Sequence, residues 1–151
     1  MPTLYLMVGI PASGKSTYAA SLNCQIVCPD AIRETYPPMP EREVFAKAKQ
    51  KIQSALKAGK NVVLDATNVL RCWRADVIGA GRPYASKIVC IWMDTPLEIC
   101  ISRHQERVKL GIRTILPVEV IKKYNQWLTD NPPDYNEGFD EIRKISVKEK
   151  K

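Results

Sequence analysis

The sequence contains a single histidine, His104, and none of its five cysteines forms a CxxC pair. Zinc sites use cysteine and histidine ligands at short, regular spacings, so these counts argue against a zinc protein. The cysteine number is odd, and three of the five lie on or beside predicted strands. We therefore expect reduced, mostly buried thiols rather than disulfides. The five residues are Cys24, Cys28, Cys72, Cys90 and Cys100.

The chain also lacks long apolar segments. It has no run of about 18 apolar residues, no charged-then-apolar leader and no lipidation signal. We therefore expect a soluble, cytoplasmic protein with no membrane partner. A length of 151 residues predicts one domain, residues 1–151, that is large enough to bury a substantial core.

The most informative motif begins at Gly9, directly after the apolar run Leu4–Val8. Residues 9–16 have the form GxxxxGK[ST], which is the phosphate-binding loop found between a strand and a helix. In such a loop the backbone N–H groups point at a phosphate, Lys15 reaches the β- and γ-phosphates, and the Ser16 hydroxyl can ligate Mg²⁺. The helix expected at residues 15–23 adds the positive end of its dipole. The motif predicts a protein that binds a nucleoside triphosphate.

Strands and helices alternate along the predicted chain. We expect strands at residues 3–8, 25–28, 61–64, 87–93 and 142–147, and helices at 15–22, from 30, at 41–58, 71–80, 96–110 and 117–128. This order predicts a three-layer α/β fold, of the P-loop NTPase or kinase type, with a mainly parallel central sheet.

Three aspartates follow predicted strands, at the edge of the sheet where α/β proteins bind ligands. Asp65 ends Val62-Val63-Leu64-Asp65, which has the form of a Walker B strand, so we expect it to help Ser16 hold Mg²⁺. Alternatively, it only begins the turn that follows. Asp94 could play the same part, but its place just before the capping box that we expect at Thr95–Glu98 favours a role in the turn.

Asp30 and Arg33 are three residues apart at a predicted helix start, so their side chains share a face. Phosphoryl transfer to an alcohol needs an acceptor for the hydroxyl proton and a cation beside the transferring group. This pair would supply both. On local evidence alone, Asp30 could instead cap the helix, with Arg33 in solvent.

Basic residues exceed acidic ones, and the net charge is +7. Residues 103–123 contain six basic and two acidic residues, and residues 141–151 contain five basic and two acidic ones. A basic chain end is usually only solvated. Arg103, Arg107 and Arg113, however, could close over phosphates as part of a helical lid at about residues 103–123. The alternative is a solvated basic face, and we place His104 on the outer face of the helix.

Aromatic residues offer a further possibility. Tyr36, Tyr124 and Trp127 could stack on a nucleobase. For Tyr124 and Trp127 we favour packing on the apolar face of their helix.

Together and in this order, these segments resemble the kinase domain of polynucleotide 5′-hydroxyl kinases, as found in phage and bacterial end-healing enzymes. The likeness spans essentially the whole chain. It rests on Gly9–Thr17, Pro29–Arg33, Val62–Asn68, Arg103–Arg107 and Leu116–Ile121. It implies ATP and Mg²⁺ as cofactors, the 5′-OH end of DNA or RNA as partner, and a bacterial or phage-infected host cytoplasm.

The resemblance also implies roles for single residues. Asp30 would be the general base on the 5′-hydroxyl, and Arg33 would contact the phosphate being transferred. Lys15 and Ser16 would hold ATP and Mg²⁺, and Arg103 and Arg107 would bind ATP phosphates. We expect the catalytic residues to be Lys15, Asp30, Arg33 and Arg107. The residues expected to contact the nucleotide are Gly9, Ile10, Pro11, Ala12, Ser13, Gly14, Lys15, Ser16, Thr17, Arg103, Arg107 and Arg113.

Two other functions stay open. The segments Asp30–Arg33 and Asp65–Asn68 are also shared with small-molecule kinases and with zeta-toxin-like sugar-nucleotide kinases. The first is a kinase for a small alcohol such as a sugar, nucleoside or antibiotic. The second is a non-catalytic NTP-binding switch, but we find neither switch loops nor a water-positioning residue. The sequence contains no DxD[GS]T-like phosphatase motif, so we expect a stand-alone kinase, of unknown oligomeric state.

Overall fold

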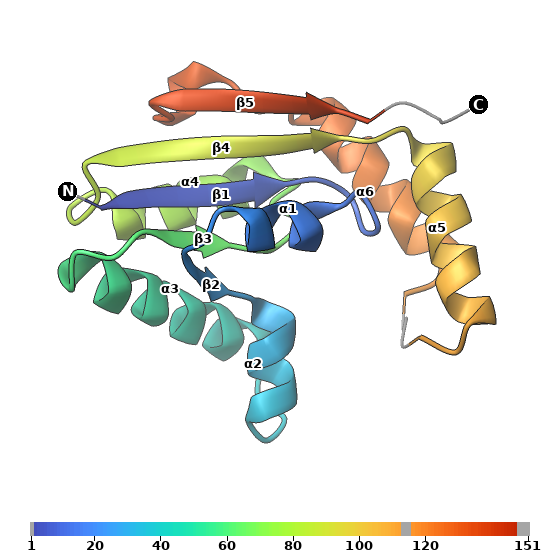
Figure 1. Ribbon diagram of the computed structural model, residues 1–151, viewed down its shortest axis with the longest axis horizontal. Coiled ribbons are helices and arrows are strands. Elements are labelled where there is room, and N and C mark those ends of the chain that lie inside the picture. The colour runs from blue at the N-terminus through green and yellow to red at the C-terminus, as the bar shows by residue number, and fades with distance from the viewer. Residues whose placement is uncertain (1, 113–115, 148–151) are drawn as a thin grey trace.

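The computed structural model describes residues 2–112 and 116–147. Within these residues, five parallel strands form one sheet in the order β2-β3-β1-β4-β5 (Figure 1). Their bounds are β1 Thr3–Val8, β2 Gln25–Val27, β3 Val62–Leu64, β4 Lys87–Asp94 and β5 Glu141–Ser146. The predicted α/β fold with a parallel sheet is confirmed.

Helices cover both faces of this sheet. The helices are α1 Lys15–Ser21, α2 Pro29–Thr35, α3 Glu41–Lys57, α4 Arg71–Gly81, α5 Leu97–Lys109 and α6 Val118–Asp130, with a 3-10 turn η1 at Tyr135–Glu137. The helices α3, α4 and α6 contribute to the larger core cluster, whereas α1 packs in a smaller cluster on the other face. Because helices cover both faces, β1 buries Leu4 and Leu6 on one side and Met7 on the other.

The spacing of apolar residues in the sequence correctly predicted the buried face of α3. Apolar residues three and four positions apart form its buried face, as expected for an amphipathic helix. These residues are Val44, Ala48, Ile52, Ala55 and Leu56.

Three local predictions were wrong or only partly right. The capping box is absent: Pro96 is the N-cap of α5 without a side-chain bond, because the Thr95 hydroxyl donates instead to the Ser13 carbonyl at 2.7 Å. His104 is only 8% exposed, since it continues the buried stripe that Cys100 begins four residues earlier. All five cysteines lie in the described residues and are free, but only Cys90 and Cys100 are buried, and Cys72 is exposed.

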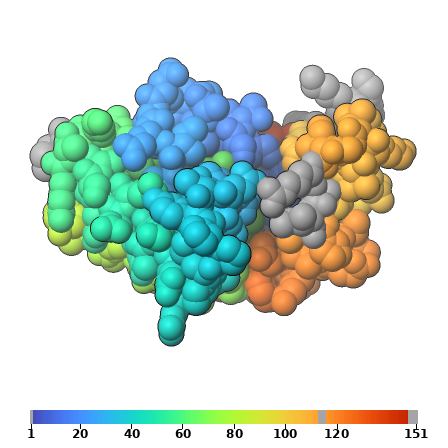
Figure 2. All heavy atoms as spheres, turned by 90° about the horizontal axis from the view of Figure 1, so that it is seen from below, coloured from blue at the N-terminus to red at the C-terminus, as the bar shows by residue number. Residues whose placement is uncertain are grey.

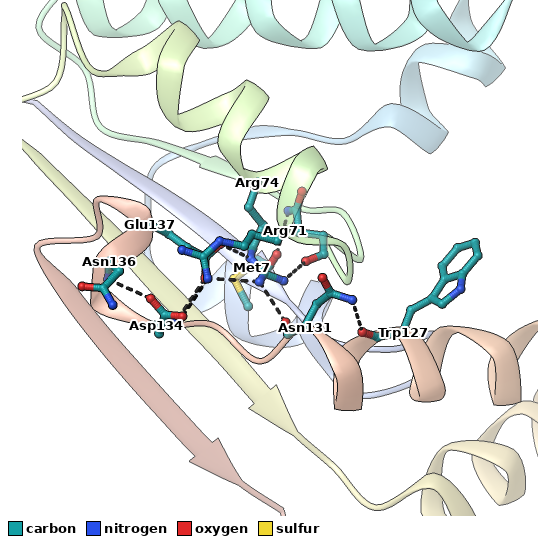
Figure 3. A network of polar contacts seen from close by, with 9 residues as sticks. Met7, Arg71, Arg74, Trp127, Asn131, Asp134, Asn136 and Glu137 are labelled. Atoms are coloured by element: carbon teal, nitrogen blue, oxygen red, sulfur yellow. Dashed lines mark hydrogen bonds and ion pairs between the residues drawn. The ribbon is translucent and has the colours of Figure 1, made fainter.

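A buried ion pair ties the sheet to the C-terminal part of the chain (Figure 3). Arg74 of α4 is fully buried, and its Nε and Nη2 donate to the Glu137 carboxylate at 2.7 and 3.2 Å. The same guanidinium donates to the carbonyls of Asn68 and Asn131, at 3.0 and 2.8 Å. Asn68 in turn donates from Nδ2 to the Met7 carbonyl at the end of β1, at 2.8 Å. The side chains of Arg74 and Asn68 thus link β1, the loop after β3, the end of α6 and η1.

Among residues 2–112 and 116–147, no helix has both the length and the apolar character that crossing a bilayer requires.

Candidate active site

The phosphate-binding loop lies between β1 and α1, at the carboxyl edge of the sheet. Gly14 has φ +101° and Ala12 has φ +67°, which are left-handed conformations that reverse the chain. A Cβ on Gly9 would lie 2.6 Å from Ser13 Oγ, so the close approach of these two residues requires glycine. Ser13 is buried, and its hydroxyl has no hydrogen-bond partner among the described residues. The loop is therefore tightly wound, with an unpaired hydroxyl on its inner side.

Lys15 folds back over this loop. Its Nζ donates to the Ile10 carbonyl at 2.8 Å. Burial lowers the pKa of Lys15 to about 8, whereas the carboxylates of Asp65 and Asp30 act to raise it. Both carboxylates thus lie close enough to influence the ammonium group. A bound phosphate would add further negative charge beside the buried Lys15 ammonium group.

Ser16 and Asp65 meet beside the loop. The Ser16 hydroxyl donates to Asp65 Oδ2 at 2.7 Å, which joins the first turn of α1 to the residue after β3. The loop after β3 is also tied to the phosphate-binding loop, because the Gly9 N–H donates to the Thr67 carbonyl at 3.0 Å.

A hydroxyl and a carboxylate are hard oxygen ligands of the kind that Mg²⁺ takes, usually with phosphate oxygens and water completing the shell. The described residues contain no cluster of three or more histidine, cysteine, aspartate or glutamate residues that would hold a metal alone. Ser16 and Asp65 therefore fit a magnesium ion that arrives with a triphosphate.

Asp30 and Arg33 form an ion pair on α2, as their spacing predicted. Arg33 Nη1 donates to Asp30 Oδ1 at 2.6 Å. Cys28 is the N-cap of α2 and Pro29 is its first residue, so the alternative prediction of Asp30 as the cap is wrong. The Asp30 side chain is 82% exposed and free to meet a ligand.

Arg33 also makes a contact that the sequence analysis missed. Its Nε and Nη2 donate to the Glu41 carboxylate at 3.0 and 2.6 Å. Glu41 is the first residue of α3, beyond a proline-rich turn. Opposite charges eight residues apart across such a turn are a weak signal, because the turn geometry decides whether they meet.

The helix α5 reaches the phosphate-binding loop from the other side. Arg103 Nη1 donates to the Ala12 carbonyl at 3.2 Å. Arg107 is exposed one turn further on, and its charge helps to lower the pKa of Lys15. Gly111, with φ +70°, follows the helix. Arg113 lies outside the described residues.

The aromatic residues of α6 pack against α4, as we favoured. The rings of Tyr124 and Trp127 stack with centroids 5.3 Å apart, and Trp73 meets Trp127 edge-on at 5.8 Å. Tyr36 packs against the core, with Lys47 Nζ 4.6 Å from its ring centroid. Asp94 ends β4 and pairs with Lys144 of β5 at 3.6 Å.

Comparison with known proteins places this arrangement in a family. Residues 4–130 match the family model described as an AAA domain. The chain belongs to the AAA domain family. This AAA domain is 28% identical over 172 residues to the L-seryl-tRNA(Sec) kinase of Methanococcus maripaludis, an alignment that covers 95% of the chain and 66% of that kinase. The chain thus spans just under two thirds of the relative's length.

Solved structures resemble this AAA domain over most of its length. A chain in the structure of the Pnkp1/Rnl/Hen1 RNA repair complex matches with a TM-score of 0.76 and 28% identity, over 92% of this chain and 46% of that one. A putative kinase from Chloroflexus aurantiacus matches with a TM-score of 0.69 and 16% identity, over 96% and 85%. A gluconokinase from Sinorhizobium meliloti 1021 matches with a TM-score of 0.61 and 15% identity, over 99% and 85%. These last two likenesses concern the fold alone. Taken together, the family match and the phosphate-binding loop identify a P-loop domain that is similar to these kinases.

Proposed function

We propose that this kinase transfers the γ-phosphoryl group of ATP to the 5′-hydroxyl end of DNA or RNA. The observation that carries the proposal is the exposed Asp30 carboxylate, which Arg33 contacts at 2.6 Å on the helix after β2, at the same edge of the sheet as the phosphate-binding loop. This carboxylate can accept the proton of an alcohol while the neighbouring guanidinium neutralises the phosphoryl group.

In the proposed reaction, the acceptor oxygen attacks the γ-phosphorus as the bond to the β–γ bridging oxygen breaks. The hydroxyl proton passes to an Asp30 oxygen, and ADP leaves. Residues 9–17 cradle the phosphates, and Lys15 contacts the β- and γ-phosphates. Mg²⁺, when held by Ser16 and Asp65, neutralises charge on the same phosphates. Arg33 contacts the transferred group.

Residues 1–151 act in this proposal as one kinase domain, with a lid at about residues 103–123. Arg103 already contacts the phosphate-binding loop through the Ala12 carbonyl. With Arg107 and Arg113 it would exchange such contacts for ATP phosphates and exclude water when the nucleotide binds.

The net charge of +7 supports a polyanionic acceptor. The RNA repair complex and the seryl-tRNA kinase, both at 28% identity, support an acceptor that is a nucleic acid or is carried by one. The seryl-tRNA relative favours a second candidate, the hydroxyl of a seryl group on tRNA.

One assay separates these acceptors. ATP labelled in the γ-phosphate is offered with 5′-OH DNA and RNA oligonucleotides, the same oligonucleotides bearing a 5′-phosphate, seryl-tRNA, and a panel of sugars and nucleosides. We expect label on the 5′-OH oligonucleotides, none on their 5′-phosphorylated copies, and labelling at least about a hundredfold slower with Asp30→Asn. Label confined to seryl-tRNA or to a small alcohol would overturn the proposal.

Salt dependence gives a second readout. If two to four acceptor phosphates are engaged, log K for a single strand should fall against log salt with a slope of roughly −1.5 to −3. A neutral alcohol would give a flat line. ATP affinity, measured in the same buffers, corrects for general effects of salt.

A further inference from the structure

The guanidinium of Arg33 is divided between two carboxylates on different helices. The edge formed by Nε and Nη2 meets Glu41 of α3, and Nη1 meets Asp30 of α2. The ring of Phe45, one turn after Glu41, lies 5.9 Å from Arg33 Cζ. The first two turns of α3 therefore hold Arg33 from one side. In Figures 1 and 2, α2 lies between α3 and the helices α5 and α6.

This division leaves part of the guanidinium open. The group carries five N–H donors in a fixed plane. The three bonds to Glu41 and Asp30 use one N–H on each nitrogen, so one N–H remains on Nη1 and one on Nη2. Free N–H groups on two neighbouring nitrogens can bind oxygens of a phosphoryl group. Glu41 occupies the edge formed by Nε and Nη2, and these two N–H groups have no partner among the described residues.

We propose that Glu41 is a positioning residue, which holds the Nε–Nη2 edge of Arg33 so that its free N–H groups face the transferring phosphoryl group. This inference rests on the proposed function, because it assigns Arg33 to the transferred phosphate. The side chains of Arg33 and Glu41 are 36% and 64% exposed, so their attraction adds little to stability. Orientation is what a bidentate pair supplies at such a site.

Glu41 also stands in the first turn of α3, where any acidic residue favours the helix dipole. Glu43 provides a matched control, because it is an exposed glutamate in the same first turn. Glu41→Gln and Glu43→Gln remove the same charge from the same helix end. Only Glu41→Gln weakens the contact with Arg33.

The test compares steady-state kinetics of wild type, Glu41→Gln and Glu43→Gln. We expect kcat to fall about tenfold in Glu41→Gln, as for a small displacement of a catalytic group, with the KM for ATP unchanged. Glu43→Gln should stay within about twofold of wild type, and all three should unfold at the same denaturant concentration. Equal kcat values for the two variants would overturn the inference.

A double-mutant cycle shows whether Glu41 acts through Arg33. Arg33→Ala should lower kcat by itself, and adding Glu41→Gln should then lower it no further. An undiminished tenfold loss in the Arg33→Ala background would overturn the positioning role. NMR gives a readout independent of activity: the Arg33 Nε–H signal should be protected from exchange in wild type and Glu43→Gln and lose that protection in Glu41→Gln.

Failure of the proposed function looks different. If wild type labels no 5′-OH end, the acceptor proposal falls, and the same variants are compared on whichever acceptor of the panel is labelled. A Glu41→Gln defect that appears there, and depends on Arg33, would uphold the positioning role.

Discussion

Arg74 and Arg33 make the same contact in opposite surroundings. Each donates from Nε and Nη2 to a glutamate carboxylate. The side chains of Arg74 and Glu137 are 0% and 2% exposed, whereas those of Arg33 and Glu41 are 36% and 64% exposed. Every polar contact of Arg74 is to protein, including two carbonyls. Two N–H groups of Arg33 have no partner among residues 2–112 and 116–147, and Arg33 stands beside an exposed carboxylate.

The two ion pairs are expected to differ in their contribution to stability. Breaking a buried pair leaves an uncompensated charge away from water, so the buried contact matters for stability. Water screens the exposed pair, so its contribution to stability is small and its effect is on geometry. One ion pair fastens α4 to η1, and in our proposal the other acts on the substrate.

The largest effect should come from Glu137→Gln, which leaves Arg74 charged and buried without its counterion. We expect the free energy of unfolding to fall by about 3 kcal/mol, whereas the matched Glu41→Gln should change it by less than about 0.5 kcal/mol. Urea unfolding at unchanged m-value measures both. Equal stabilities for the two variants would show that burial does not distinguish these pairs.

Asp30→Asn should act in the opposite way. It keeps the size of the side chain but removes the proposed base, so kcat should fall at least about a hundredfold. The urea midpoint should stay at the wild-type value, because the Asp30 side chain is 82% exposed. A lowered midpoint with near-normal kcat would assign Asp30 a structural role.

Arg103→Ala should have a smaller effect, confined to the nucleotide. Because Arg103 contacts the phosphate-binding loop at the Ala12 carbonyl, we expect the KM for ATP to rise about tenfold, the effect of about 1.4 kcal/mol. Lys109→Ala removes the same charge from the same helix and should leave this KM within about twofold. A defect seen only in the KM of the acceptor would move Arg103 to the acceptor side.

The smallest effect concerns the protonation of Lys15, a third cation, which donates to a carbonyl instead of a carboxylate. Burial lowers its pKa from 10.5 to about 8, so the unfolded chain binds the proton more tightly. The cost of burying charged Lys15 is therefore present below about pH 8 and is relieved between about pH 8 and 10.5.

ATP should restore the charged form and take up about half a proton at pH 8. Calorimetry in two buffers of different ionisation enthalpy measures this uptake, and Lys15→Met should abolish it. Equal uptake by wild type and Lys15→Met would show that Lys15 does not respond to the nucleotide.

Local patterns predicted the parts of the fold that depend on neighbouring residues. The loop at Gly9–Ser16, the buried face of α3 and the Asp30–Arg33 pair all follow from spacing along the chain. Contacts set by the tertiary fold could not be predicted. Arg74 and Glu137 are 63 residues apart, and Thr95 forgoes a local cap for a carbonyl 82 residues away. His104 was predictable, because Cys100 four residues earlier marks the buried face.

The strand order places the proposed site residues on two sides of the central strand β1. The segments after β2 and β3 carry Asp30 and Asp65 on one side, and the segment after β4 carries Arg103 on the other. The proposed base and the proposed magnesium ligand thus come from two separate segments, α2 and the residue that follows β3. A change in α2 or at the start of α3 would therefore alter the proposed acceptor side and leave the Ser16–Asp65 contact in place.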